Sequence, residues 1–228
     1  MKTLGILGGV GPETTSKIYE SVISAVRESG SKIYPPILIF NLPYAFAWEE
    51  EMILQGKIDN ILPNLVHGTK LLEASGADFV ILPCNTLHPH IDTLRRAVKI
   101  PVLSIVEETA VRLTAERIIK VGVLGTKATM KYKLYNRILR RQGIQVMTPS
   151  QADQRMINKI IVDLVRGKHT KNHEQIIKRI CASLQKQGAE SILFACTDLQ
   201  LINVGSKIPI IDSTEVLINA SVREIIST

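Results

Sequence analysis

The stretch FVILPCNTLHPH, residues 79–90, carries the pattern on which the fold depends: an apolar run ends in Pro83 and Cys84, and polar residues follow directly. A second stretch, SILFACTDLQLI at residues 191–202, repeats this arrangement around Cys196. Short, near-continuous apolar runs bounded by turn residues are typical of strands that are buried on both faces of a parallel sheet. We therefore expect each cysteine to lie at the carboxyl end of a buried strand.

Other segments of the chain also occur twice and in the same order. The segment LGILGGVGPETT at residues 4–15 resembles VGVLGTKAT at residues 121–129, and IPVLSI at residues 100–105 resembles IPIIDS at residues 208–213. Three matching pairs in one order favour two homologous halves.

Helical patterns separate the apolar runs. Ile18, Val22 and Val26 recur at the spacing of one helix face, as do similar residues between the other runs. We expect an α/β fold of two similar domains, each a parallel sheet flanked by helices, related by a pseudo-twofold axis. Because functional groups gather at the carboxyl ends of parallel strands, Cys84 and Cys196 should face each other across an interdomain cleft.

The composition narrows the function classes. The 228-residue chain is 45% apolar and 21% charged, has no apolar run long enough to cross a bilayer, and turns glycine-rich where a signal peptide would remain apolar. We expect a cytoplasmic protein whose three cysteines are thiols. The net charge of +7 comes from dispersed residues and only 4% of residues are aromatic, which disfavours nucleic acid and leaves attraction of small anions open.

The loop GGVGPETT at residues 8–15 follows a predicted strand and precedes a predicted helix. Gly11 can adopt backbone conformations that other residues avoid, Pro12 suits the first turn of a helix, and free N–H groups there favour an anion. The spacing matches neither the dinucleotide fingerprint nor the phosphate-binding P-loop. We interpret the loop as positioning a small carboxylate, with a plain tight turn as the alternative.

Several roles for the cysteines can be compared with their surroundings. The chain lacks a C-x-x-C pair for a redox motif or a metal site, and His88 and His90 alone are too few ligands for a metal. A phosphatase loop would need an arginine six residues after its cysteine, where His90 and Ile202 stand. Cys181 lies in a helical pattern and is interpreted as a core residue. Cys84 and Cys196 remain as a pair of acid/base thiols.

Two opposed thiols suit stereoinversion at a carbon atom. One thiolate removes a proton from one face, and the opposite thiol delivers a proton to the other. N–H and hydroxyl donors would stabilise the charge that moves onto a substrate carboxylate, and no bound cofactor is required. The residues that could donate in this way are Asn85, Thr86, Thr126 and Thr197.

Four motifs, GILGGVGPETT, LPCNTLH, VGVLGTKAT and ACTDLQLI, together resemble the aspartate/glutamate racemases of the wider Asp/Glu/hydantoin racemase superfamily over nearly the whole chain. The resemblance implies a cofactor-independent amino-acid racemase that acts on a small-molecule amino acid, with Cys84 and Cys196 as its two bases. From the composition and the motif spacing we expect no metal and no nucleic-acid or membrane partner. The resemblance also implies a homodimer, and a first domain of residues 1–100 plus 210–228 around a second domain of residues 101–209.

The resemblance further implies a set of substrate-binding residues: Gly9, Val10, Asn85, Thr86, Thr126, Arg166, Thr197 and Asp198. Two departures concern the substrate. Asp198 stands where relatives commonly carry glutamate, and residues 41–57 contain Trp48 and three glutamates but no arginine to bind a side-chain carboxylate. Glutamate or a less acidic amino acid therefore stays open beside aspartate. A hydantoin racemase, a maleate isomerase and a non-catalytic binder or thiol sensor remain alternatives.

Overall fold

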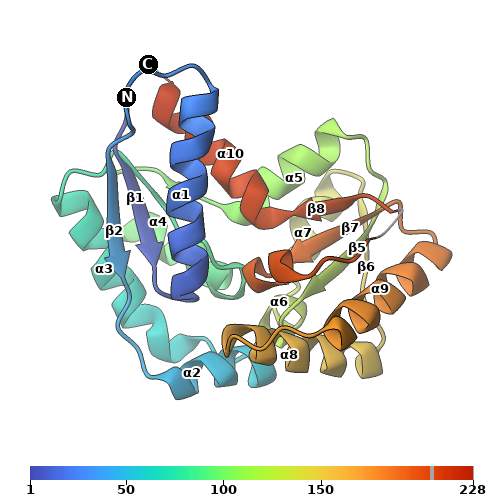
Figure 1. Ribbon diagram of the computed structural model, residues 1–228. Helices are drawn as coiled ribbons and strands as arrows, with labels where there is room; N and C mark the ends of the chain where they lie inside the picture. The colour runs from blue at the N-terminus through green and yellow to red at the C-terminus, as the bar shows by residue number, and fades with distance from the viewer. Residues whose placement is uncertain (206–207, 228) are drawn as a thin grey trace.

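The computed structural model describes residues 1–205 and 208–227, which contain two parallel four-stranded sheets (Figure 1). The first sheet has the order β2-β1-β3-β4 and the second the order β6-β5-β7-β8, and every pairing within them is parallel. The predicted α/β fold is thus confirmed. The strands are β1 (Leu4–Gly8), β2 (Ile37–Asn41), β3 (Phe79–Ile81), β4 (Val102–Leu103), β5 (Lys120–Gly125), β6 (Gln145–Met147), β7 (Ser191–Ala195) and β8 (Ile210–Asp212).

The repeat seen in the sequence corresponds to equivalent strands. Strands β1, β3 and β4 hold the same positions in the first sheet as β5, β7 and β8 in the second. The central strands are buried along their length, which explains their uninterrupted apolar sequences.

Helices cover the sheets, and short helical segments connect them to the strand ends. They are α1 (Pro12–Glu28), α2 (Phe46–Glu50), the π-helical η1 (Glu51–Gln55), the 3₁₀ turn η2 (Asp59–Ile61), α3 (Leu62–Ala74), the 3₁₀ helix η3 (Asn85–His90), α4 (Ile91–Ala97), α5 (Ile105–Ala115), α6 (Lys127–Lys131), α7 (Asn136–Arg141), α8 (Gln151–Val165), α9 (Lys171–Lys186), the 3₁₀ helix η4 (Thr197–Leu201) and α10 (Ser213–Ile226). No helix in the described ranges is both long and apolar enough to cross a lipid bilayer.

The last helix connects the two halves. Helix α10 packs against α1 and α5, and the two termini lie side by side in Figure 1. The Lys2 N–H donates to the Ile225 carbonyl oxygen at 3.0 Å, and the Lys2 ammonium pairs with Glu224 at 2.6 Å. Strand β4 belongs to the first sheet and β8 to the second. The domain division itself stays a prediction.

A continuous apolar core joins the halves on the side of α5 and α10. Ile6 of β1, Val123 of β5 and Leu217 of α10 belong to one buried cluster. Each fully buried side chain of this size contributes about 1.5–3 kcal/mol. The halves are therefore held together at this core, and the carboxyl ends of the strands meet beside it.

Candidate active site

The two repeated cysteines occupy equivalent positions. Cys84 follows β3 and is the residue before η3, and Cys196 follows β7 directly and precedes η4. Backbone N–H groups of Thr86 and Leu87 stabilise charge on the Cys84 sulfur, and the N–H of Asp198 does the same for Cys196. N–H groups at the start of a helical turn have no partner within it, so they favour a thiolate over a thiol.

Both cysteines line a single cavity between the halves, as the symmetry of the sequence predicts. The cavity has a volume of about 30 Å³, little more than the space of one water molecule. Its lining residues come from loops of both halves and from η1 and α8. They are Val10, Gly11, Glu49, Met52, Ile53, Cys84, Asn85, Thr86, Thr126, Ile161, Val165, Cys196, Thr197 and Asp198.

Most of the predicted substrate-binding residues reach this cavity, but Gly9 and Arg166 do not. Gly9 has φ +94°, and a side chain there would place its Cβ 2.6 Å from the Leu42 backbone nitrogen. The residue therefore shapes the loop beneath the cavity. Arg166 lies at the end of α8, where its guanidinium pairs with Glu50 outside the cavity lining. A direct role of either residue with substrate stays a prediction.

Asn85 is held by side chains from the other half. The Tyr135 hydroxyl donates to Asn85 Oδ1, and Asn85 Nδ2 donates to Ser213 Oγ at 2.9 Å. Ser213 donates in turn to the Phe194 carbonyl oxygen at 2.8 Å. A side-chain amide carries two N–H donors, so one remains for a ligand in the cavity. Sequence reasoning missed the contribution of Tyr135 and Ser213 to the site, because their contact with Asn85 joins segments far apart in the chain.

A pair of threonines joins the halves on another side of the cavity. The hydroxyls of Thr86 and Thr126 lie 2.9 Å apart, and Thr126 Oγ1 also accepts the Thr129 N–H at 3.3 Å as the cap of α6. These bonds hold two hydroxyl groups at the cavity wall. They could turn toward a substrate carboxylate without any change of backbone.

His88 supports the Cys84 loop from below. Its Nε2 accepts the Ile105 N–H at 3.1 Å, so the ring proton lies on Nδ1 and is donated to the Cys84 carbonyl oxygen at 2.8 Å. Burial lowers the pKa of His88 to about 4, which keeps the ring neutral. His90 has its own partner, the Ile58 carbonyl oxygen at 3.0 Å. The His88 and His90 side chains thus fix the positions of the backbone segments to which they bond, at Cys84, Ile105 and Ile58.

The electrostatics of the cavity favour protonated thiols in this closed form. Burial raises the pKa of Cys84 to about 12 and that of Cys196 well above its usual range. The Cys196 sulfur lies 3.5 Å from Asp198 Oδ2, and burial also raises the pKa of that carboxyl. The Cys196 thiol therefore donates toward the Asp198 carboxylate.

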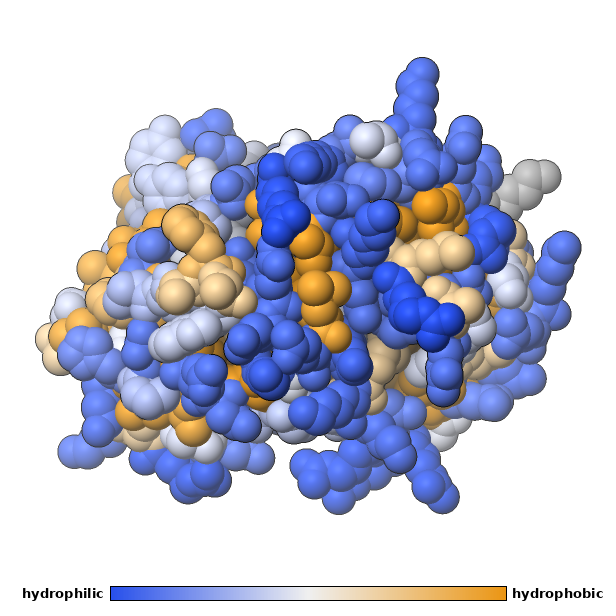
Figure 2. Space-filling model, turned by 90° about the horizontal axis from the view of Figure 1, so that it is seen from below, coloured by the Kyte–Doolittle hydropathy of each residue, from blue (hydrophilic) through white to orange (hydrophobic). Residues whose placement is uncertain are grey.

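On the face that carries α2 and α8, the segments η1 and α8 contribute apolar side chains to the cavity lining. They are Met52 and Ile53 of η1 and Ile161 and Val165 of α8. Figure 2 views this face from below and shows a mostly hydrophilic surface with a narrow hydrophobic strip near its middle. Because η1 packs directly on α8, these two segments limit the space of the cavity on this side.

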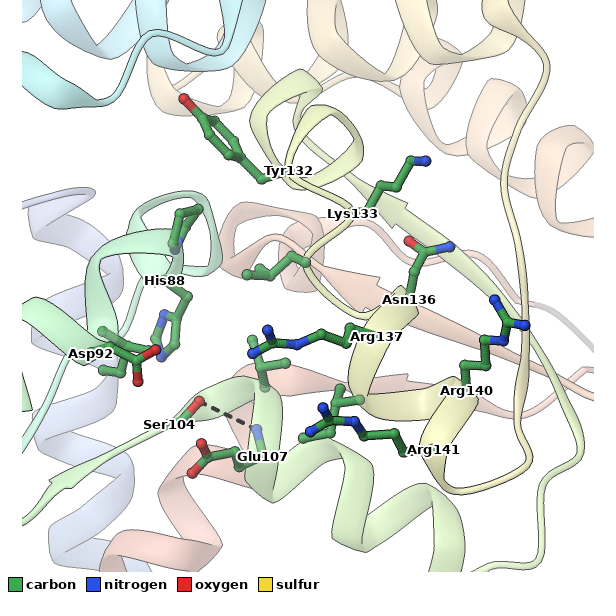
Figure 3. A pocket seen from close by; sticks show the side chains of 15 residues that line it. His88, Asp92, Ser104, Glu107, Tyr132, Lys133, Asn136, Arg137, Arg140 and Arg141 are labelled. Atoms are coloured by element: carbon green, nitrogen blue, oxygen red, sulfur yellow. Dashed lines mark hydrogen bonds between the residues drawn. The ribbon is translucent and has the colours of Figure 1, made fainter.

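A larger cavity of about 800 Å³ lies elsewhere, between α4, α5 and the α7 region (Figure 3). Its walls carry Asp92 and Glu107 on one side and Arg137, Arg140 and Arg141 on the other. No cysteine lines it. His88 lines this larger cavity and also bonds to the Cys84 carbonyl oxygen. The size of the larger cavity does not supply the pair of thiols on which the acid/base chemistry would depend.

The comparisons with known proteins agree with this arrangement. The family model described as Asp/Glu/Hydantoin racemase matches residues 7–221, and the chain belongs to this family. It is 31% identical over 225 residues to the "Broad specificity amino-acid racemase RacX" of Bacillus subtilis, covering 96% of each chain.

Two solved structures have closely similar folds. PH1733, an aspartate racemase homologue from Pyrococcus horikoshii, superposes with a TM-score of 0.81 at 29% identity over 100% of both chains. The aspartate racemase of Picrophilus torridus superposes with a TM-score of 0.81 at 26% identity over 99% of this chain and 94% of its own. The resemblance seen in the motifs is thereby confirmed.

Proposed function

We propose that this protein is a cofactor-independent amino-acid racemase in which Cys84 and Cys196 act on opposite faces of the substrate α-carbon. The observation that carries the proposal is the placement of both thiols in one interdomain cavity. Membership in the racemase family and the similarity to an amino-acid racemase over 96% of the chain support it.

The proposed reaction needs one thiolate and one thiol. The thiolate takes the α-proton, and the electron pair of the broken C–H bond delocalises into the substrate carboxylate. The opposite thiol then gives its proton to the other face of the carbon, which leaves the inverted amino acid and the thiol and thiolate exchanged. Donors from Asn85, Thr86 and Thr197 would stabilise the negative charge on the carboxylate in the transition state.

Substrate binding must also generate the thiolate. In the closed form, burial disfavours a charged sulfur. An incoming ammonium group would supply a nearby positive charge, which lowers the pKa of both thiols, while the backbone N–H groups at each cysteine contribute in the same direction. Entry requires separation of η1 from α8, because a cavity of about 30 Å³ cannot hold an amino acid.

The test is racemisation of single amino acids, followed by chiral chromatography, together with exchange of the α-hydrogen in heavy water. Cys84→Ser and Cys196→Ser should each lower racemisation by about 10²-fold or more, the usual size of an acid/base contribution. The matched control is Cys181→Ala, because Cys181 is a buried residue of α9 that lies in the apolar core and outside the cavity. A Cys84→Ser, Cys196→Ser double variant that racemises at the wild-type rate would contradict the proposal.

Two further expectations from the sequence remain proposals. The chain should form a homodimer, which light scattering of the purified protein measures directly. It should also be found in the cytoplasm, which cell fractionation tests.

A further inference from the structure

We infer that the preferred substrates are amino acids with a cationic side chain, an ammonium or a guanidinium group, which the carboxylate of Glu49 binds. The inference rests on the proposed racemase function and concerns the side-chain end of the same cavity. It is carried by the charges of the residues that line this cavity and by the position of Glu49 within it.

The cavity lining is acidic. Glu49 and Asp198 are its ionisable carboxylates, and none of the described lining residues is a lysine, arginine or histidine. Arg166 lines an adjoining cavity instead, where its guanidinium is already paired with Glu50. Within the cysteine cavity a substrate side-chain carboxylate would therefore meet like charge, although the chain as a whole carries a net charge of +7.

Glu49 is held in place with part of its carboxylate free. The Tyr44 hydroxyl donates to Glu49 Oε1 at 3.1 Å, and the Gly11 N–H also stabilises the carboxylate. An ionised carboxylate offers about four acceptor positions, so these two donors leave capacity for a ligand. Burial, with the nearby charges of Asp198 and Glu13, raises the pKa of Glu49. A bound cation would relieve this repulsion.

The position of Glu49 also suits a long side chain. Glu49, Ile53 and Val165 line both the cysteine cavity and an adjoining cavity of about 240 Å³. The second cavity extends past Pro12 and Phe46 and adds the carboxylates of Glu13 and Glu50 and the guanidinium of Arg166, which is paired with Glu50, so that carboxylates outnumber cations there. An extended aliphatic side chain could pass between the apolar residues and place a terminal cation at this acidic border.

The two carboxylates of the cysteine cavity can then serve two different cations. Asp198 contacts the Cys196 sulfur at 3.5 Å, close to where the α-carbon must lie, and so suits the α-ammonium group. Glu49 accepts the N–H of Gly11, and a Cβ added at Gly11 would come 3.8 Å from Asp198 Oδ1, so the two carboxylates both border this residue. A diamino acid would satisfy both carboxylates at once.

The experiment measures kcat/KM of the full-length protein for single L-amino acids by chiral chromatography. Lysine, ornithine and arginine are compared with aspartate and glutamate, and norleucine serves as the neutral counterpart of lysine. A charge-assisted bond to Glu49 should make lysine better than norleucine by about 10- to 100-fold, and glutamate worse than either. Glu49→Gln should lower the lysine-to-norleucine ratio by about tenfold or more.

The matched control is Glu51→Gln, a neighbouring carboxylate that does not line the cavity, and it should keep the wild-type ratio. Faster turnover of aspartate or glutamate than of the cationic amino acids would overturn this inference and leave the racemase proposal standing. A lysine-to-norleucine ratio that Glu49→Gln does not change would also overturn it. Absence of turnover and of α-hydrogen exchange for every amino acid would overturn the racemase proposal itself. The wild-type panel decides the question even if a variant fails to fold.

Discussion

Replacing Tyr135 with phenylalanine should remove one of the hydrogen bonds that position Asn85 in the candidate active site. Tyr135 and Asn85 are each 1% exposed, and the Tyr135 hydroxyl is the donor to Asn85 Oδ1. The variant keeps the aromatic ring in the core but leaves this oxygen without its partner. A buried acceptor without a donor costs about 1–3 kcal/mol, so the free energy of unfolding should fall by this amount. For a chain of 228 residues this corresponds to a Tm lower by about 2–10 °C.

The same change should affect catalysis, because the Asn85 amide can then rotate about its remaining bond to Ser213. If Asn85 donates to the carboxylate in the transition state, kcat should fall by about tenfold or more while KM changes little. Thermal unfolding and racemisation kinetics measure the two effects separately. The control is Tyr132→Phe, because Tyr132 is 38% exposed and lines the larger cavity instead. A Tyr135→Phe variant with unchanged Tm and unchanged kcat would refute the reasoning, and a lower Tm alone would assign Tyr135 a purely structural role.

Three other predictions depend on single contacts. Gly8→Ala should lower the free energy of unfolding by about 1–3 kcal/mol, since its Cβ would lie 2.4 Å from Thr15 Cγ2, and an unchanged urea midpoint would contradict this. Burial raises the pKa of Asp212 to about 6. Between about pH 4 and 6 the folded state therefore binds more protons than the unfolded state, and the free energy of unfolding falls as the pH rises through this range. Asp212→Asn should remove this decline, worth up to about 3 kcal/mol, and a pH–stability curve that keeps the wild-type slope would speak against it. Arg166→Gln removes the ion pair that joins the end of α8 to Glu50 of α2. Substrate entry should become faster, and stopped-flow binding would report this as a higher association rate constant. An equal or lower rate constant would count against this role of Arg166.

The location of the thiols could be read from the sequence for a local reason. Buried parallel strands need uninterrupted apolar residues, and the residues just after them lie at one edge of the sheet. The runs before Cys84 and Cys196 therefore predict both strand ends, and the repeat predicts that the two ends are equivalent. The same reasoning predicts four polar residues, because each lies within two residues of a strand end or of the cysteine that follows it: Asn85, Thr86, Thr126 and Thr197.

What surrounds the thiols was decided only by tertiary structure. The amide of Asn85 bonds to Ser213, 128 positions away, and to Tyr135, 50 positions away, and no local pattern encodes such pairs. The same holds for Glu49, which reaches the cavity because α2 packs beside the first loop, and for Arg166, whose partner is Glu50. Strand burial is a property of neighbouring residues, whereas the charge and closure of a cavity between two halves depend on how distant segments pack. The sequence by itself thus determined where the sulfurs and the polar residues beside them lie, and packing decided that Tyr135, Ser213 and Glu49 join them around the cavity.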